Sequence, residues 1–207
     1  MIEVEKAADR IMLRGAEIEI AFQYAGDRWQ HFVSVRCEGK WLVLMESEEG
    51  LPSDEAPPSP ALQDLRFEQI ADDIFEFQLL GQAGKGFYSA AVRFDGTRRT
   101  INFDVCARGR SGDAPLCTAS RYILADRGCF PSVRQHETAL VLLPNGAGPI
   151  EFAPAGVPGG RLVECRIMDE QTKRRIAAGC FEPFPSQPGR KPASVRWMYR
   201  VTCVREP

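Results

Sequence analysis

The sequence has almost no net charge, only two histidines and no long apolar run. Its 26 basic and 28 acidic residues leave a net charge of −2, so the chain lacks the positive field that nucleic-acid binding requires. The opening stretch MIEVEKAADRIMLRG has acids where a signal peptide needs a positive start, and it lacks the continuous apolar segment needed for export or membrane insertion. We therefore expect a cytoplasmic protein with neither nucleic-acid nor membrane partners.

Several motifs of catalysis and cofactor binding are also missing. The sequence has no Gly-x-Ser-x-Gly nucleophile elbow and no Gly-x-Gly-x-x-Gly fingerprint after a strand. The stretch GQAGKG, residues 81–86, differs from a phosphate loop in its glycine spacing, and Gly86 stands where the hydroxyl residue should follow the lysine. It predicts a turn between two strands, and we expect no cofactor.

The seven cysteines are an odd number and include no Cys-x-x-Cys pair. This usage is typical of reduced, partly buried thiols rather than of a disulfide framework. Cys106, Cys117, Cys129 and His136 follow one another along the chain, but Cys106 belongs to a strand pattern, so we expect no metal site.

What the sequence does contain is alternation of apolar and polar residues. About eleven segments show the period of two that is typical of strands. A helix of two or three turns is the most that MDEQTKRRIAAG, residues 168–179, could form. The predicted strands are EIEIAFQY, HFVSVRC, KWLVLMES, DIFEFQLL, FYSAAVRF, TINFDVCAR, RYILAD, ALVLLP, PIEFAP, RLVECRIM and SVRWMYRVTCV.

So many antiparallel strands predict two packed sheets, because one open sheet of this size would expose too much apolar surface. We expect an all-β fold, a large antiparallel two-sheet β-sandwich, as a single domain over residues 1–207. The acidic, proline-rich residues 48–62 break the pattern and predict an extended surface loop. Oligomerisation through edge strands, as in a structural protein, stays open.

Three segments resemble motifs of a group of uncharacterised bacterial β-rich proteins: SPALQDL (59–65), LLGQAGKGFYSAAV (79–92) and FDVCAR (103–108). More loosely, the layout over residues 27–122 resembles the supersandwich of galactose mutarotase-like domains. That resemblance implies sugar binding on a concave sheet face, with a carboxylate and a histidine acting at an anomeric centre. His31 and His136 are the available histidines, but neither lies in a motif that matches the family residue by residue.

The strongest polar group lies on the predicted outer face of two neighbouring strands. Arg93, Asp104 and Arg108 share this face, and Arg121 follows later in the chain. These side chains could bind a sugar or carboxylate, or they could form ion pairs on a solvated sheet. Trp29, in the turn GDRWQH, is the aromatic residue expected to be exposed and able to stack on a sugar ring.

Two functions follow from these observations. The first is non-catalytic binding of a carbohydrate or small polar ligand by Trp29, Arg93, Asp104, Arg108 and Arg121. The alternative is a carbohydrate-active enzyme on a mutarotase-like scaffold, in which His31 or His136 works with a carboxylate such as Asp104 as an acid–base pair. Each histidine could equally be a hydrogen-bonded structural residue.

Overall fold

The structure, a computed structural model, describes residues 2–110, 116–124, 132–156, 163–169, 175–180 and 194–204. Within these ranges the chain forms sixteen β-strands in two eight-stranded antiparallel sheets, which confirms the predicted all-β sandwich. No helix occurs in these ranges, so none is long and apolar enough to cross a membrane. The predicted number of strands is too low, because five strands were missed: β1, β2, β6, β11 and β15.

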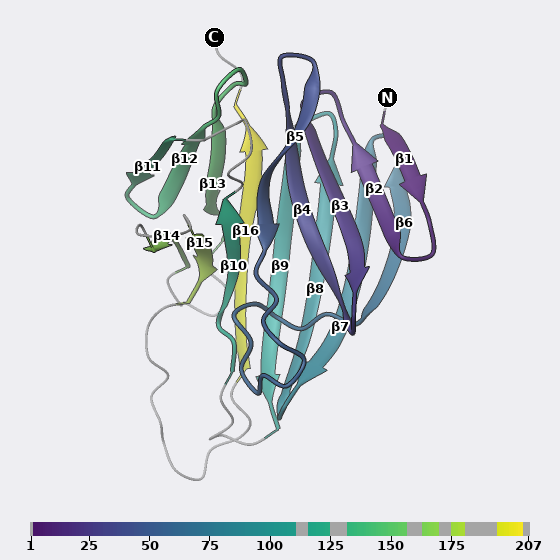
Figure 1. The fold of residues 1–207 in the computed structure, drawn as a ribbon, viewed down its shortest axis with the longest axis vertical. Coiled ribbons are helices and arrows are strands. Elements are labelled where there is room, and N and C mark those ends of the chain that lie inside the picture. Colours follow the sequence, from purple (N-terminus) through teal and green to yellow (C-terminus); the bar gives the residue numbers. More distant parts are fainter. Residues whose placement is uncertain are drawn as a thin grey trace.

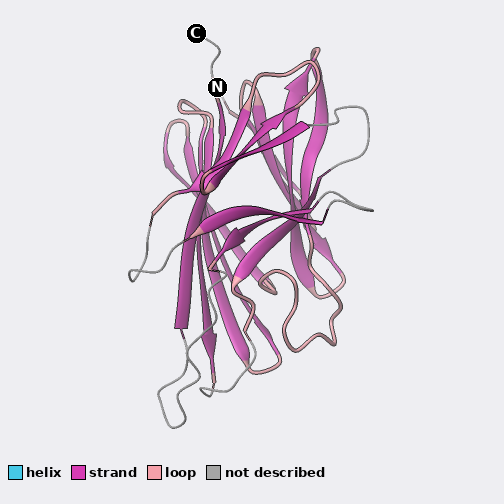
Figure 2. Cartoon of the chain, turned by 90° about the vertical axis from the view of Figure 1, so that its left-hand side faces the viewer, coloured by secondary structure: helices cyan, strands magenta, loops and turns pink. Residues whose placement is uncertain are grey.

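Sheet A has the strand order β1-β2-β3-β4-β5-β10-β15-β14, and sheet B the order β11-β12-β13-β16-β9-β8-β7-β6. Figure 1 shows sheet A lying across sheet B, and Figure 2 shows the two layers from the side. The strands of sheet A are β1 (Glu3–Lys6), β2 (Arg10–Arg14), β3 (Ile18–Ala25), β4 (Arg28–Cys37), β5 (Lys40–Ser47), β10 (Ala119–Leu124), β14 (Glu164–Asp169) and β15 (Arg175–Gly179). Those of sheet B are β6 (Asp64–Ala71), β7 (Ile74–Ala83), β8 (Gly86–Asp95), β9 (Thr100–Gly109), β11 (Ser132–His136), β12 (Ala139–Leu143), β13 (Ile150–Pro154) and β16 (Ser194–Cys203).

The core lies between the sheets and follows the period of two in the sequence. In β16 the buried side chains alternate with half-buried and exposed ones, and Trp197 and Tyr199 are almost fully buried. β8 and β9 behave in the same way, with Tyr88 and Phe103 inside. Because successive side chains of a strand point to opposite faces, this alternation fixes which residues line the outer face of sheet B.

The turns were predicted correctly where glycine marks them. Gly84 adopts a positive φ of 53° in the turn between β7 and β8, so GQAGKG is a hairpin rather than a phosphate loop. Gly26, with a φ of 72°, turns β3 into β4. Glycine suits such positions because it lacks the Cβ that disfavours this conformation.

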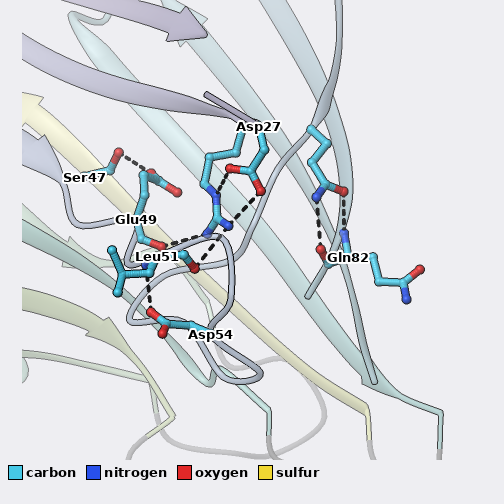
Figure 3. A network of polar contacts seen from close by, with 8 residues as sticks. Asp27, Ser47, Glu49, Leu51, Asp54 and Gln82 are labelled. Atoms are coloured by element: carbon cyan, nitrogen blue, oxygen red, sulfur yellow. Dashed lines mark hydrogen bonds and ion pairs between the residues drawn. The ribbon is translucent and has the colours of Figure 1, made fainter. Parts of the chain in front are cut away.

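Residues 48–62 are only partly the surface loop that their prolines predicted. Pro57 and residues 59–62 are buried, and Leu62 accepts a hydrogen bond from the backbone of Trp29. This half of the segment therefore packs between the sheets as the chain passes from sheet A to sheet B. The preceding half is held by the guanidinium of Arg28, which contacts Asp27 and donates to the carbonyls of Glu49 and Leu51 (Figure 3).

The expectation of a helix over residues 168–179 is wrong for the described part of that segment. Met168 and Asp169 end β14, and Arg175–Gly179 forms β15. β15 pairs with β10 on one side and β14 on the other, and Ile176, Ala177 and Ala178 are completely buried. Pairing and burial outweigh the helix preference of alanine and arginine.

Candidate ligand-binding groove

The outer face of sheet B carries two rows of aligned side chains across strands β6, β7, β8, β9 and β16. One row runs Arg66, Gln78, Ala91, Asp104 and Met198, and the next runs Asp64, Leu80, Ser89, Cys106 and Arg196. None of these ten side chains is buried. They face away from the core because their neighbours in sequence point into it.

A groove of about 820 Å³ lies over these rows. Its middle is lined by small side chains, Ser89, Ala91 and Cys106, whereas longer ones such as Arg66 and Arg196 line its two ends. The hollow follows from this order, since short side chains on the central strands leave space between long ones on the outer strands. Its volume is within the range of about 300–1,000 Å³ that ligand pockets usually occupy.

Asp104 and Arg196 form a paired contact within the groove. The Arg196 Nε donates to Asp104 Oδ1 at 2.7 Å, and a second guanidinium nitrogen donates to Asp104 Oδ2. Both hydrogen bonds hold the planar groups side by side, and the bond to Asp104 raises the pKa of Arg196. The pair stays accessible, with exposed fractions of 54% for the Arg196 side chain and 28% for that of Asp104.

The other arginines of the predicted site lie outside this groove. Arg93 and Arg108 are exposed on the same face of sheet B, as predicted, but neither lines the groove. Arg93 is opposite Glu76 and Asn102 in the neighbouring strands. Arg121 belongs to β10 of sheet A, so the structure does not bring it together with Asp104.

Trp29 does not stand free in a turn. It lies in β4, is half-buried and packs against the core. Its ring meets Tyr24 of β3 edge-on, with 5.4 Å between ring centroids. Trp29 therefore belongs to sheet A, and it does not line the groove.

The two histidines lie in different sheets and different surroundings. His31 of β4 is 6% exposed, and burial lowers its pKa to about 3. Its Nε2 is 2.8 Å from the hydroxyl of Tyr122 rather than near a carboxylate. His136 ends the edge strand β11 and is exposed, and within the described ranges no histidine lines the groove.

Cys106 differs from the other described cysteines because its thiol is half-buried in the groove. Cys37, Cys117, Cys165, Cys180 and Cys203 are buried, and burial raises the pKa of Cys117 to about 12. Cys129 lies outside the described residues. Among the residues that the structure describes, no cluster of His, Cys, Asp or Glu could hold a metal ion.

Sequence reasoning found Asp104 but missed its partner Arg196 and the groove residues of β6. Alternation along the last strand does place Arg196 on the face opposite Trp197. The missing information is the strand order, because Asp104 and Arg196 are 92 residues apart in sequence. Period alone says which face a side chain occupies but not which strand lies next to it.

Comparisons of the sequence with protein families and with curated proteins find no match. The two-sheet sandwich and the groove geometry are therefore the basis for assigning a function.

Proposed function

We propose that this chain is a non-catalytic binding protein for a carbohydrate or another small polar ligand, which it holds on the outer face of sheet B. The observation that carries the proposal is the groove of about 820 Å³ with the Asp104–Arg196 pair within it. Sites for small ligands are typically concave and contain a few polar groups that fix orientation. The odd number of cysteines and the lack of a Cys-x-x-Cys pair in the sequence support the further proposal that the protein acts in the cytoplasm.

The charges of the groove favour a neutral ligand. Two acids, Asp64 and Asp104, are matched by two arginines, Arg66 and Arg196. The groove therefore has no excess charge that would attract an anion or a cation. A sugar hydroxyl both donates and accepts hydrogen bonds, so it can accept from the Arg196 guanidinium and donate to the Asp104 carboxylate.

The groove also offers an apolar contact. Leu80 lines it and is 58% exposed, so it can cover the C–H face of a sugar ring. The looser resemblance to galactose mutarotase-like domains supports the same ligand class. Because His31 is buried and His136 does not line the groove, the geometry supports binding better than acid–base catalysis at this site.

A glycan array with the full chain, followed by calorimetry of the glycans that bind, tests the proposal. We expect Asp104→Ala to weaken binding at least tenfold, or about 1.4 kcal/mol, because the variant loses one acceptor and leaves Arg196 without its partner. The free energy of unfolding should change by no more than about 1 kcal/mol, the usual contribution of an exposed ion pair.

The matched control is Glu151→Ala. Glu151 pairs with Arg200 at 3.3 Å on sheet B, outside the groove lining, so this variant should bind like the wild type. Equal losses in both variants, or an array with no signal above background, would contradict the proposal.

A further inference from the structure

A network of hydrogen-bonded polar side chains crosses the apolar core between the sheets. The Nε2 of His31 in sheet A lies 2.8 Å from the hydroxyl of Tyr122, which is 2.5 Å from the hydroxyl of Tyr199 in sheet B. Close by, the indole nitrogen of Trp197 donates to Ser120 at 3.1 Å. These groups are almost completely buried, so each needs a partner inside the protein.

One atom of this network has no hydrogen-bond partner among the described residues. His31 Nδ1 is fully buried and makes no hydrogen bond to the protein. The histidine also lines an interior cavity next to Phe22 and Phe103. The cavity leaves about 10 Å³ for the centre of a water-sized sphere, which is close to the minimum that a single water molecule requires.

Nδ1 of His31 needs a hydrogen-bond partner in either tautomer of the imidazole. If Nε2 accepts from Tyr122, Nδ1 carries the proton and needs an acceptor. If Nε2 donates to Tyr122, Nδ1 carries a lone pair and needs a donor. Water can fill both roles, and buried waters typically make about three hydrogen bonds.

We propose that this cavity binds one ordered water molecule, which hydrogen-bonds to His31 Nδ1. The side-chain oxygens available for its other hydrogen bonds are those of Ser59, Ser120 and Tyr199, which line the same cavity. Ser59 belongs to the segment between the sheets, Ser120 to sheet A and Tyr199 to sheet B. Through these groups the water links His31 to the opposite sheet or to the connecting segment.

A crystal structure of the full chain that resolves ordered water, combined with NMR of the same protein, tests this proposal. We expect density for one water at about 2.7–3.2 Å from His31 Nδ1. In solution, the His31 ring protons should show magnetisation transfer from a long-lived water. Density that is empty at Nδ1, or a protein atom in hydrogen-bond contact with it, would overturn the proposal.

Two variants locate the water in this cavity. Ala90 lines the cavity, so Ala90→Val should fill the space and abolish the water signal at the His31 ring. Its neighbour Ala91 faces outward, so the same change there, Ala91→Val, should preserve the signal. A signal that persists in Ala90→Val would also overturn the proposal, whereas the wild-type measurements stand even if that variant does not fold.

Discussion

The His31 imidazole lies among aromatic rings, with Phe22, Phe103 and Tyr122 between 5.3 and 5.7 Å away. Burial lowers its pKa from 6.5 to about 3. The unfolded chain therefore binds a proton at this residue below about pH 6.5, whereas the folded chain does so only near pH 3. Because the unfolded state binds more protons between these values, the free energy of unfolding falls as the pH falls.

We expect His31 to contribute a slope of at most about 1.4 kcal/mol per pH unit to the free energy of unfolding. Urea unfolding between pH 7.5 and pH 4 measures it, and His31→Gln should remove it. His136→Gln is the control, because His136 is exposed and the variant should keep the wild-type slope. An unchanged slope in His31→Gln would show that His31 is not the residue responsible.

Glu49 affects the pH dependence of the free energy of unfolding in the opposite direction. Burial raises the pKa of its carboxyl to about 7, although hydrogen bonding from Ser47 and the charge of Arg28 partly offset the shift. Between about pH 4.5 and 7 the folded state therefore holds a proton that the unfolded state has lost, so the free energy of unfolding falls as the pH rises.

Glu49→Gln should flatten this part of the stability profile, because the amide resembles the protonated acid and does not titrate. Chemical unfolding at half-unit steps from pH 4.5 to pH 7.5 would detect the change. Glu55→Gln, an exposed position in the same segment, should leave the profile as it is in the wild type. If both variants follow the wild-type profile, Glu49 is ionised in the folded protein at pH 5.

At the scale of elements, the passage of the chain between the sheets depends on a close backbone contact at β7. A Cβ on Gly81 would lie 1.9 Å from the carbonyl oxygen of Ala61, and a backbone atom in a packed segment cannot move aside cheaply. Gly81→Ala should lower the free energy of unfolding by roughly 1–3 kcal/mol, the usual cost of overpacking. Denaturant unfolding measures this.

The control for Gly81 is Gly156→Ala, where the nearest atom to an added Cβ is the Met198 sulfur at 3.8 Å. This variant should be as stable as the wild type or close to it. Equal stability of both variants would mean that Ala61 does not pack against β7 as described.

Arg28 holds the first half of the segment between β5 and β6. It is 3% exposed, and its fork of donors reaches both Asp27 and the carbonyls of Glu49 and Leu51. A lysine has one point charge and lacks this fork. Arg28→Lys should therefore speed hydrogen exchange in residues 49–54.

The control is Arg98→Lys. Arg98 is 83% exposed, and its Nε lies 3.7 Å from Asp95 Oδ2, which is longer than a hydrogen bond. We expect wild-type exchange in that variant. Exchange in residues 49–54 that is unaltered by Arg28→Lys would show that charge alone holds the segment.

Alternation in the sequence predicted the faces of β8, β9 and β16, because period two is a local property that burial enforces on long strands. It did not predict β6, in which no residue is buried and only Leu65 and Phe67 pack against the core. The error at β15 has a different origin. There, pairing on both sides with β10 and β14 outweighed a local preference for helix.

The candidate site was predictable only in part, for a related reason. The outward position of Asp104 follows from the buried Phe103 and Val105 on either side of it. Its pairing with Arg196 depends on β16 lying next to β9, a contact across most of the chain. Arg108 was included because alternation places it on the same face as Asp104, and it is exposed there but does not line the groove. Arg121 was included because it follows later in the chain, and it lies in the other sheet.

At the scale of the whole molecule, the inner and outer faces of the sheets have different roles in the proposed function. The inner faces form the core, and the outer face of sheet B presents the groove. The chain has a net charge of −2, and the groove has equal numbers of acids and arginines. Neither feature steers charged partners over long distances, so selectivity for a neutral ligand would come from contacts within the groove.

Protection of the Cys106 thiol measures occupation of the groove most directly. Among the described cysteines, Cys106 is the one that is not buried, so it should react first with a thiol reagent in the folded protein. The protein for this measurement carries Cys129→Ser, which removes the cysteine outside the described residues. The probe is the glycan that binds most tightly on the array.

We expect saturating glycan to slow the reaction of Cys106 at least tenfold in this protein. Adding Asp104→Ala should raise the glycan concentration needed for this slowing at least tenfold, while denatured protein should react equally fast with and without glycan. A glycan that binds with measurable affinity and leaves the Cys106 rate unchanged would show that the ligand site lies elsewhere than on the outer face of sheet B.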